Sequence, residues 1–429
     1  MKHMLIAAAA AALMGPAGAA GAQTELVLGR FFGACEAAGL DPAAEVGEAC
    51  IIESIIRSFS AAENGITVET LPTEWNNYYD QIKAAYAGGN PPDVHVMHRH
   101  RVMEFASLGA IAPLTEDELA SVGIDTSDWA PAALEAVSFD GQIYAVPMDF
   151  HALLWHVNMD LMEQAGLVDE NGEPMIPSSP EELLAQADAV EEATGKHYMA
   201  QQFQAGVFGM RTAMAFVMQQ GANLYEGDEV TVETDAMVEA ATLIQTLIDE
   251  DHIDVQLDYP GAQQAFLDGE AAILVNGTWI VDFYDSQAAD ESVPLQNYHV
   301  TNFPTLYDQP AVWADTHMWA IPASLKRDDP EKFQAALQLL AHINENNAAW
   351  AKTGHMAVRT SVLESEAYNN LPHRADYAET AANSRDIPPT VRYGAIQDTL
   401  ARELLAAWMG NKSLEDALSD AQLDIEDLL

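Results

Sequence analysis

Short apolar runs alternate with amphipathic stretches over the first hundred residues of the chain. Residues 25–29, 66–71 and 93–97 have the length and apolar content of buried strands. Between the first two runs, apolar side chains recur at helical spacing: Ile51, Ile52, Ile55, Ile56 and Phe59. A helix rich in aromatic residues separates the second run from the third. This order of strands and helices predicts right-handed crossovers and a mainly parallel sheet.

Two further extended segments predict places where the chain passes between lobes. Residues 142–146 and 152–157 are adjacent extended segments, and residues 301–304 form the second crossing. A chain of 429 residues is also longer than a single hydrophobic core usually supports. We therefore expect an α/β fold with two lobes, each a mainly parallel sheet flanked by helices, as in type II periplasmic binding proteins. The expected boundaries are 23–149 plus 304–343 for the N-lobe, and 150–303 plus 344–429 for the C-lobe.

The first 22 residues have the features of a Sec signal peptide. Lys2 and His3 precede an apolar run over residues 4–14, and Ala20-Gly21-Ala22 forms an A-x-A cleavage site. The run is too short to span a bilayer, and no later stretch approaches the roughly 20 apolar residues of a transmembrane helix. No cysteine follows the cleavage site to carry a lipid. We expect a mature periplasmic protein that starts at Gln23.

The chain is strongly acidic, with 66 Asp and Glu against 18 Lys and Arg and a formal net charge of −48. A field of this sign excludes nucleic acid and anionic membranes as natural partners. The acidic residues are dispersed, without an acidic tail, which is typical of a solvated surface suited to salt.

Cys35 and Cys50 are the only cysteines. An oxidising compartment favours a disulfide between them, closing a 16-residue segment and contributing roughly 3 kcal/mol in the chain-entropy model. Their spacing fits neither C-x-x-C nor a zinc knuckle, so we expect a structural staple rather than redox or metal chemistry.

The chain carries none of the short catalytic signatures G-x-S-x-G, H-E-x-x-H, Walker A or G-x-G-x-x-G. A glycosidase leaves no such signature, because its two carboxylates meet only in the fold. We expect no enzyme activity and no cofactor, with a secreted glycan-active hydrolase as the alternative.

Histidines form the one cluster that resembles a metal site. They are His95, His98 and His100 around the end of the third strand, with His151, His156 and His317 elsewhere. Neutral imidazoles can ligate zinc, but no acidic or thiolate partner accompanies them locally, and Arg99 and Arg101 would repel a cation. We expect no metal, and a metal-binding receptor is a second alternative.

Aromatic and charged side chains follow the predicted strands. Phe31 and Phe32 come after the first strand, Trp75 after the second, His100 after the third, and Trp279 after residues 271–275. Ligands of open α/β sheets bind at the carboxyl ends of strands. Aromatic faces stack on the C–H faces of pyranose rings while polar groups satisfy the hydroxyls, so this mixture favours a sugar.

Several motifs, taken in order and spacing, resemble one known family over nearly the whole mature chain. They are Pro91-Pro92-Asp93-Val94, Phe105-x-x-Leu-Gly109-x-Ile-x-Pro-Leu114, Gly141-Gln-Ile-Tyr-Ala-Val-Pro147, Trp155-His-Val-Asn158, Gln164-Ala-Gly-Leu167, Ala265-Phe266-x-x-Gly269-x-Ala-Ala-Ile273, Gly277-Thr-Trp279 and Ala417-Leu418. The family is the extracellular solute-binding proteins of sugar-importing ABC transporters (family 1), whose best-known member binds maltose and maltodextrins. The resemblance implies a receptor that passes a carbohydrate to the transmembrane subunits of a permease, and the closing motion of the two lobes favours a monomer.

The resemblance also implies roles for individual residues. His100 and Arg101 fall at sugar-contact positions, Asp149 at an acidic hinge-side contact, and Trp279 and Tyr393 at or near stacking aromatics. Met97 stands where the maltose-type protein has tryptophan, which favours a smaller or differently shaped ligand. The candidate ligand-binding residues are Phe32, Trp75, His98, His100, Arg101, Asp149, His151, Trp279, Trp313, His317 and Tyr393.

Arginines fall on several candidate cleft segments: Arg30, Arg99, Arg101, Arg211, Arg359 and Arg392. A guanidinium fork fits a carboxylate, phosphate or sulfonate. An anionic sugar derivative is therefore an alternative to a neutral sugar.

Overall fold

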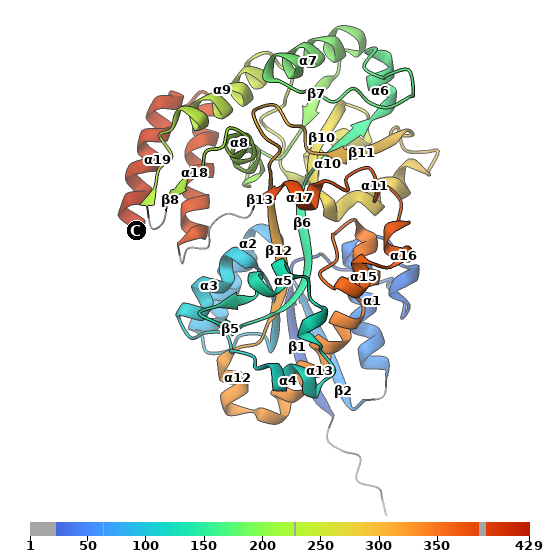
Figure 1. Cartoon of the computed structure of the whole chain (residues 1–429), viewed down its shortest axis with the longest axis vertical. Coiled ribbons are helices and arrows are strands. Elements are labelled where there is room, and N and C mark those ends of the chain that lie inside the picture. Colours follow the sequence, from blue (N-terminus) through green and yellow to red (C-terminus); the bar gives the residue numbers. More distant parts are fainter. Residues whose placement is uncertain (1–22, 63, 227–228, 386–391) are drawn as a thin grey trace, which may run out of the picture.

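A computed structural model describes residues 23–429 except 63, 227–228 and 386–391, so the predicted signal peptide lies outside the described residues. Figure 1 shows two lobes, one above the other, with β6 and β12 running through the waist between them. The strands are β1 (Thr24–Arg30), β2 (Ile66–Pro72), β3 (Val94–His98), β4 (Ser138–Phe139), β5 (Gln142–Ile143), β6 (Val146–Asn158), β7 (His197–Ala200), β8 (Tyr225–Glu226), β9 (Glu229–Val230), β10 (Ala271–Gly277), β11 (Tyr298–Asn302), β12 (Val312–Ala320) and β13 (Ser384–Arg385).

The α-helices are α1 (Glu48–Ala61), α2 (Trp75–Ala87), α3 (Arg99–Ser107), α4 (Glu116–Ser121), α5 (Pro131–Ala136), α6 (Met159–Gln164), α7 (Pro180–Thr194), α8 (Phe208–Gln219), α9 (Asp235–Asp249), α10 (Tyr259–Leu267), α11 (Val281–Ala288), α12 (Ala323–Asp328), α13 (Pro330–Glu345), α14 (Asn347–Trp350), α15 (Thr360–Leu363), α16 (Glu366–Asn369), α17 (Thr380–Asn383), α18 (Tyr393–Trp408) and α19 (Leu414–Leu428). Short 3-10 helices are η1 (Pro42–Ala44), η2 (Thr126–Asp128), η3 (Thr278–Ile280) and η4 (Ala351–Thr353). The predicted opening order β1-α1-β2-α2-β3 is confirmed, and α1 buries the isoleucines that carried its pattern.

The main sheet has the order β2-β1-β3-β12-β6-β10-β7, with β11 on β6 and β13 on β12. It is mixed rather than mainly parallel. Parallel pairing is confined to β2-β1-β3, β10-β7 and β12-β13. Every pair that includes β6 is antiparallel, as is β12-β3. The sheet is mixed because β6 and β12 carry the chain from lobe to lobe through its middle. The βαβ pattern of the first hundred residues does not reveal these two strands.

Each lobe has its own hydrophobic core, and the packing of β6 identifies the first crossing. Val146 and Met148 belong to the core of the lower lobe (the N-lobe), whereas the residues from Ala152 to Val157 belong mainly to that of the upper lobe (the C-lobe). The predicted segment 152–157 lies within the 13-residue strand β6, which begins at Val146, whereas residues 142–143 of the other predicted segment form β5, which pairs with β4. Helices α18 and α19 cover α8 and α9 on the outside of the C-lobe (Figure 1).

The second crossing lies later in the chain than predicted. Residues 298–302 form β11, an edge strand that pairs with β6 inside the C-lobe, and Phe303 and Trp313 lie in the C-lobe core. The chain returns within β12, because Met318 and Trp319 lie in the N-lobe core. An extended segment before a proline looks the same in sequence whether it is an edge strand or a crossing. The N-lobe core also includes Trp350, beyond the predicted boundary at 343.

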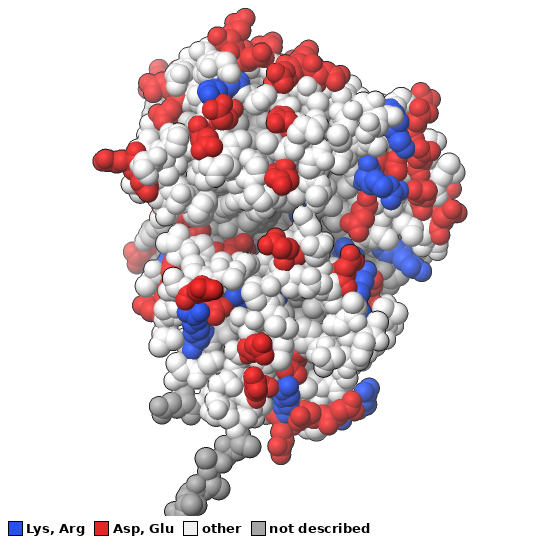
Figure 2. Space-filling view, turned by 180° about the vertical axis from the view of Figure 1, so that it is seen from behind, with Lys and Arg blue, Asp and Glu red and all other residues white. Residues whose placement is uncertain are grey.

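Three further predictions from the sequence can be compared with the structure. The disulfide between Cys35 and Cys50 is present and ties the loop after β1 to the first turn of α1. Figure 2 shows acidic side chains scattered over both lobes, as the dispersed sequence pattern indicated. Among the described residues, we find no helix whose length and apolar content would let it cross a membrane.

Candidate functional site

A cavity of about 470 Å³ lies between the lobes. The N-lobe contributes the loop after β1 and the start of α2, the C-lobe contributes α8, α10 and η3, and the crossing strands contribute one histidine each. Its wall consists of Phe31, Phe32, Gly33, Ala34, Glu48, Pro72, Thr73, Glu74, Trp75, Asn76, His98, His151, Gln202, Phe208, Arg211, Tyr259, Pro260, Trp279 and His317. A depression of about 690 Å³ on the outer side of the C-lobe, between α6 and α11, lacks this aromatic lining. We therefore place the candidate site between the lobes.

Six of the predicted site residues line this cavity together: Phe32, Trp75, His98, His151, Trp279 and His317. The other five lie outside its wall: His100, Arg101, Asp149, Trp313 and Tyr393. Trp313 and Asp149 lie directly behind the wall, where each contacts a residue that does line the cavity.

Aromatic rings from both lobes face the cavity. Trp279 Nε1 donates to the Tyr259 hydroxyl at 2.8 Å, and the Trp279 ring meets Phe208 edge to face at 5.9 Å. The Gly277-Thr-Trp279 motif has a steric reason, because a Cβ on Gly277 would lie 1.9 Å from the Trp279 ring. Glycine at this position lets the indole fold back over the end of β10. The resulting surface has apolar ring faces with polar atoms at their edges, which suits a sugar.

Arg211 on α8 is a cation in the cavity wall that forms no ion pair with any described residue, although Asp315 is close enough to attract its charge. Its guanidinium lies 3.8 Å from the centroid of the Trp313 ring and near the rings of Trp75 and Phe208. Its Nε and Nη2 atoms are buried without a hydrogen-bond partner in the described part of the chain. Burial lowers the pKa of Arg211 to about 10, so the group is still charged at neutral pH. A buried cation without a carboxylate partner is a rare arrangement that suits an anionic group on a ligand.

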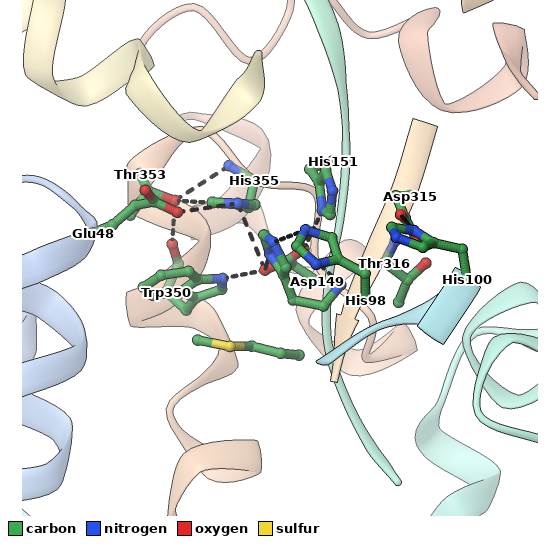
Figure 3. A network of polar contacts seen from close by, with 12 residues as sticks. Glu48, His98, His100, Asp149, His151, Asp315, Thr316, Trp350, Thr353 and His355 are labelled. Carbon is green, nitrogen blue, oxygen red and sulfur yellow. Dashed lines mark hydrogen bonds and ion pairs between the residues drawn. The ribbon is translucent and has the colours of Figure 1, made fainter. Parts of the chain in front are cut away.

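Asp149 lies at the centre of a buried polar network beneath the cavity (Figure 3). Its carboxylate accepts from Trp350 Nε1 at 2.6 Å, His317 Nδ1 at 2.9 Å and His151 Nδ1 at 3.0 Å. Burial by itself would raise the pKa of Asp149, but the surrounding histidines outweigh it and hold the pKa well below its usual range. Burial lowers the pKa of His151 to about 4, so this imidazole is neutral at neutral pH.

His100, Arg101 and Tyr393 form a separate contact between the lobes. His100 Nδ1 bonds to Asp315, and its ring lies 4.6 Å from that of Tyr393. Arg101 packs so closely on Gly394 that a Cβ there would lie 1.4 Å from its Nη1 atom. Because α3 begins at Arg99, directly after β3, the chain turns and carries these side chains toward α18 rather than into the cavity. The expectation that ligands bind at the carboxyl ends of strands therefore identified the right edge of the sheet. It did not predict the direction in which these side chains point.

Several residues of the site were not singled out as candidates from the sequence. The cavity wall also contains Glu48, Gln202, Phe208 and Tyr259, and the network below it contains Asp315 and His355. They come from separate helices and loops and share no local motif. Glycine at 277 was the one local sign of an unusual close approach, and it was noted only as part of a family pattern.

Two lobes with separate cores, joined by two strands and enclosing a cavity, define a two-lobe ligand-binding protein. Residues 54–376 match the model of the family of bacterial extracellular solute-binding proteins. The chain belongs to this family, which confirms the resemblance inferred from its motifs.

Known relatives cover almost the entire described chain. The maltodextrin-binding protein of Bacillus subtilis is 23% identical over 385 residues, which make up 86% of this chain and 85% of that protein. The GacH receptor of Streptomyces glaucescens has a similar structure, with a TM-score of 0.79 and 19% identity over 95% of this chain and 98% of that one. An ABC substrate-binding protein from Listeria monocytogenes gives a TM-score of 0.78 and 20% identity over 95% and 99%. These likenesses confirm the predicted two-lobe α/β fold.

Proposed function

We propose that this protein is the periplasmic substrate-binding subunit of an ABC importer, which captures a sugar or sugar derivative between its lobes and delivers it to the permease. Family membership supports a binding protein over a hydrolase or a metal receptor. The named relatives support a sugar: one binds maltodextrin, one was solved with acarbose and one with cycloalternan. The protein acts as a monomer and leaves its ligand unchanged.

The observation that carries this proposal is the aromatic cavity built from both lobes. Phe31 and Trp75 come from the N-lobe, and Phe208 and Trp279 from the C-lobe. A ligand that touches both sets gains contacts only when the lobes are close together. It therefore stabilises the closed arrangement by those differential contacts, with β6 and β12 as the hinge.

Arg211 supports a ligand with an anionic group. The guanidinium forms no ion pair with a carboxylate among the described residues, and three imidazoles share its cavity: His98, His151 and His317. A carboxylate, phosphate or sulfonate on the ligand would supply the charge that Arg211 lacks. We therefore expect a uronic acid, sugar phosphate or sulfonated sugar to bind more tightly than the matching neutral sugar.

A thermal-shift screen of the purified mature protein tests both statements. It compares neutral mono- and disaccharides with the corresponding anionic derivatives, followed by calorimetry on every ligand that shifts the melting temperature. A ligand at a hundredfold excess over its Kd stabilises the protein by about 2.7 kcal/mol. We expect one sugar class to give such a shift and to be recovered unchanged. No shift with any sugar, or hydrolysis of the ligand, would contradict the proposal.

Trp279→Ala tests whether this cavity is the site. Because the indole forms part of the cavity wall, we expect its loss to reduce affinity for the sugar identified in the screen by at least tenfold, about 1.4 kcal/mol. Phe283→Ala is the matched control, because this partly buried aromatic lies one turn further along, outside the cavity wall. Equal affinity losses in the two variants would place the sugar elsewhere.

A further inference from the structure

We propose that Asp149, His151, His317 and His355 form a binding site for a divalent transition metal ion of the zinc type, located at the hinge beneath the ligand cavity. All four side chains are buried. This proposal does not depend on which ligand the cavity binds. It can therefore be confirmed or disproved independently of the proposed transport function.

The donor atoms have spacings suited to such an ion. One ligand atom from each of the four residues lies within 4.8 Å of all the others. His317 Nδ1 lies 2.9 Å, and His355 Nε2 3.6 Å, from Asp149 Oδ2, and His151 Nδ1 lies 3.0 Å from Oδ1. Zinc bonds of roughly 2.0–2.2 Å in a tetrahedron place ligand atoms about 3.3 Å apart. The observed distances lie on both sides of that value, so small side-chain movements would complete the shell.

The tautomer of His355 is the observation that points most directly to a ligand atom for a cation. Thr353 Oγ1 donates its single proton to the Trp350 carbonyl at 2.7 Å. It therefore accepts from His355 Nδ1, 2.6 Å away, and the lone pair of a neutral His355 is on Nε2. This Nε2 atom is buried, has no hydrogen-bond partner in the described structure, and lies 3.6 Å from both Asp149 Oδ2 and Glu48 Oε1. A nitrogen lone pair that faces carboxylate oxygens in a buried place favours a cation between them, either a proton or a metal ion, and the metal titration below distinguishes the two.

Hydrogen bonds from surrounding groups fix the orientation of the proposed ligands, as the residues around a metal site do for the groups that bind the metal. Trp350 Nε1 donates to Asp149 at 2.6 Å, and Thr353 fixes the ring of His355 (Figure 3). His317 Nε2 lies 3.2 Å from His98 Nε2, so its second nitrogen is also engaged. Such contacts fix the tautomer and orientation of metal-binding histidines. His151 and His317 also line the cavity, which gives an ion a path to the site.

The sequence analysis led us to expect no metal site, and the tertiary structure removes the reason for that expectation. That expectation rested on the lack of an acidic partner near the histidines. In the antiparallel pairing of the two crossing strands, His317 lies directly opposite Asp149, and His151 lies two residues further along β6. An ion bound here would link β6, β12 and the loop after η4, which is the region about which the lobes move.

The experiment uses the mature protein freed of metal by a chelator and then titrated with Co²⁺ and Zn²⁺. We expect one Co²⁺ per chain, with the intense visible bands of a four-coordinate site, displaced by one Zn²⁺. His355→Gln should weaken Zn²⁺ binding at least a hundredfold. Thr353→Ala, which leaves all four proposed ligands in place but removes the hydroxyl that orients His355 and bonds to the Trp350 carbonyl, should weaken it about 10- to 100-fold.

The control is the double variant His299→Gln, His373→Gln, which removes a second and more exposed group of potential ligands, His299, His373 and Asp376. It should bind Zn²⁺ as the wild type does. If His355→Gln does not fold, X-ray absorption of the Zn²⁺-loaded wild type decides the question, because the proposal requires three imidazole ligands. No metal uptake, fewer than three imidazoles, or loss of binding only in the control variant would overturn the proposal.

Discussion

Replacing Arg211 by methionine separates a binding role from a structural one, because the two roles predict opposite effects on stability. Methionine keeps the apolar stem against Trp313 and removes the charge. Burial lowers the pKa of Arg211 to about 10, and the difference from an ordinary guanidinium corresponds to a cost of about 3 kcal/mol for keeping the charge buried. The attraction to the Trp313 ring, about 2 kcal/mol when desolvated, offsets part of that cost. We therefore expect the ligand-free variant to be as stable as the wild type, or up to about 3 kcal/mol more stable.

The same substitution should weaken binding of an anionic sugar by at least tenfold, about 1.4 kcal/mol or more, and leave binding of a neutral sugar closer to the wild type. Thermal or urea unfolding without ligand measures the first effect, and calorimetry with the anionic and neutral members of one sugar pair measures the second. Both are needed, because a loss of affinity alone could reflect a disturbed fold.

Arg374→Met is the matched control. Arg374 is also buried and also lies over aromatic rings, 4.3 Å from that of Tyr368, but its guanidinium donates to three backbone carbonyls, those of Ala351, Gly354 and His355. Removing it leaves these acceptors unsatisfied, at a cost of about 1–3 kcal/mol each. If Arg211→Met lowers stability as much as Arg374→Met does, Arg211 is structural and the argument for an anionic ligand fails.

Two further predictions concern stability. The double variant Cys35→Ser, Cys50→Ser should unfold more easily by roughly 3 kcal/mol, because the disulfide closes a 16-residue segment; an unchanged urea midpoint would show that the staple contributes nothing. Asp282 accepts from the Gly47 backbone N–H across the lobes at 2.7 Å, and burial raises its pKa to about 6. Because this folded pKa lies above the unfolded value of about 4, the contribution of Asp282 to stability is full below pH 4 and is lost as the pH rises through 6. Asp282→Asn, which remains neutral, should therefore gain up to about 3 kcal/mol over the wild type between pH 4 and pH 7 in parallel melts, and a constant difference across that range would disprove the assignment.

The fold was largely predictable because its signals are local. The isoleucines of α1 at helical spacing and the apolar runs of β1, β2 and β3 each depend only on neighbouring residues. The first crossing was also visible, because two extended segments, 142–146 and 152–157, follow one another with only a short connection between them. The second crossing was misplaced, because an edge strand and a hinge strand share the same pattern.

Site residues were predictable where they follow a strand or belong to a family motif, as Phe32, Trp75 and Trp279 do, or where they stand out as histidines, as His98, His151 and His317 do. Arg211 is one of several arginines, and nothing near it in sequence shows that it lacks a carboxylate partner. His355 is likewise an isolated histidine between ordinary loop residues. Such positions become informative only when their neighbours in space are known.

By itself, the sequence determined the opening strands and helices of the N-lobe, the disulfide, the acidic surface and membership of the solute-binding family, because periodicity, cysteine count, charge and ordered motifs are properties of the chain. Tertiary structure alone decided what the buried polar groups do. Pairing of β6 with β12 sets His317 opposite Asp149, and the turn from β3 into α3 carries His100 away from the cavity. These outcomes depend on strand register and on packing between residues more than a hundred positions apart, and short-range patterns contain no information about either.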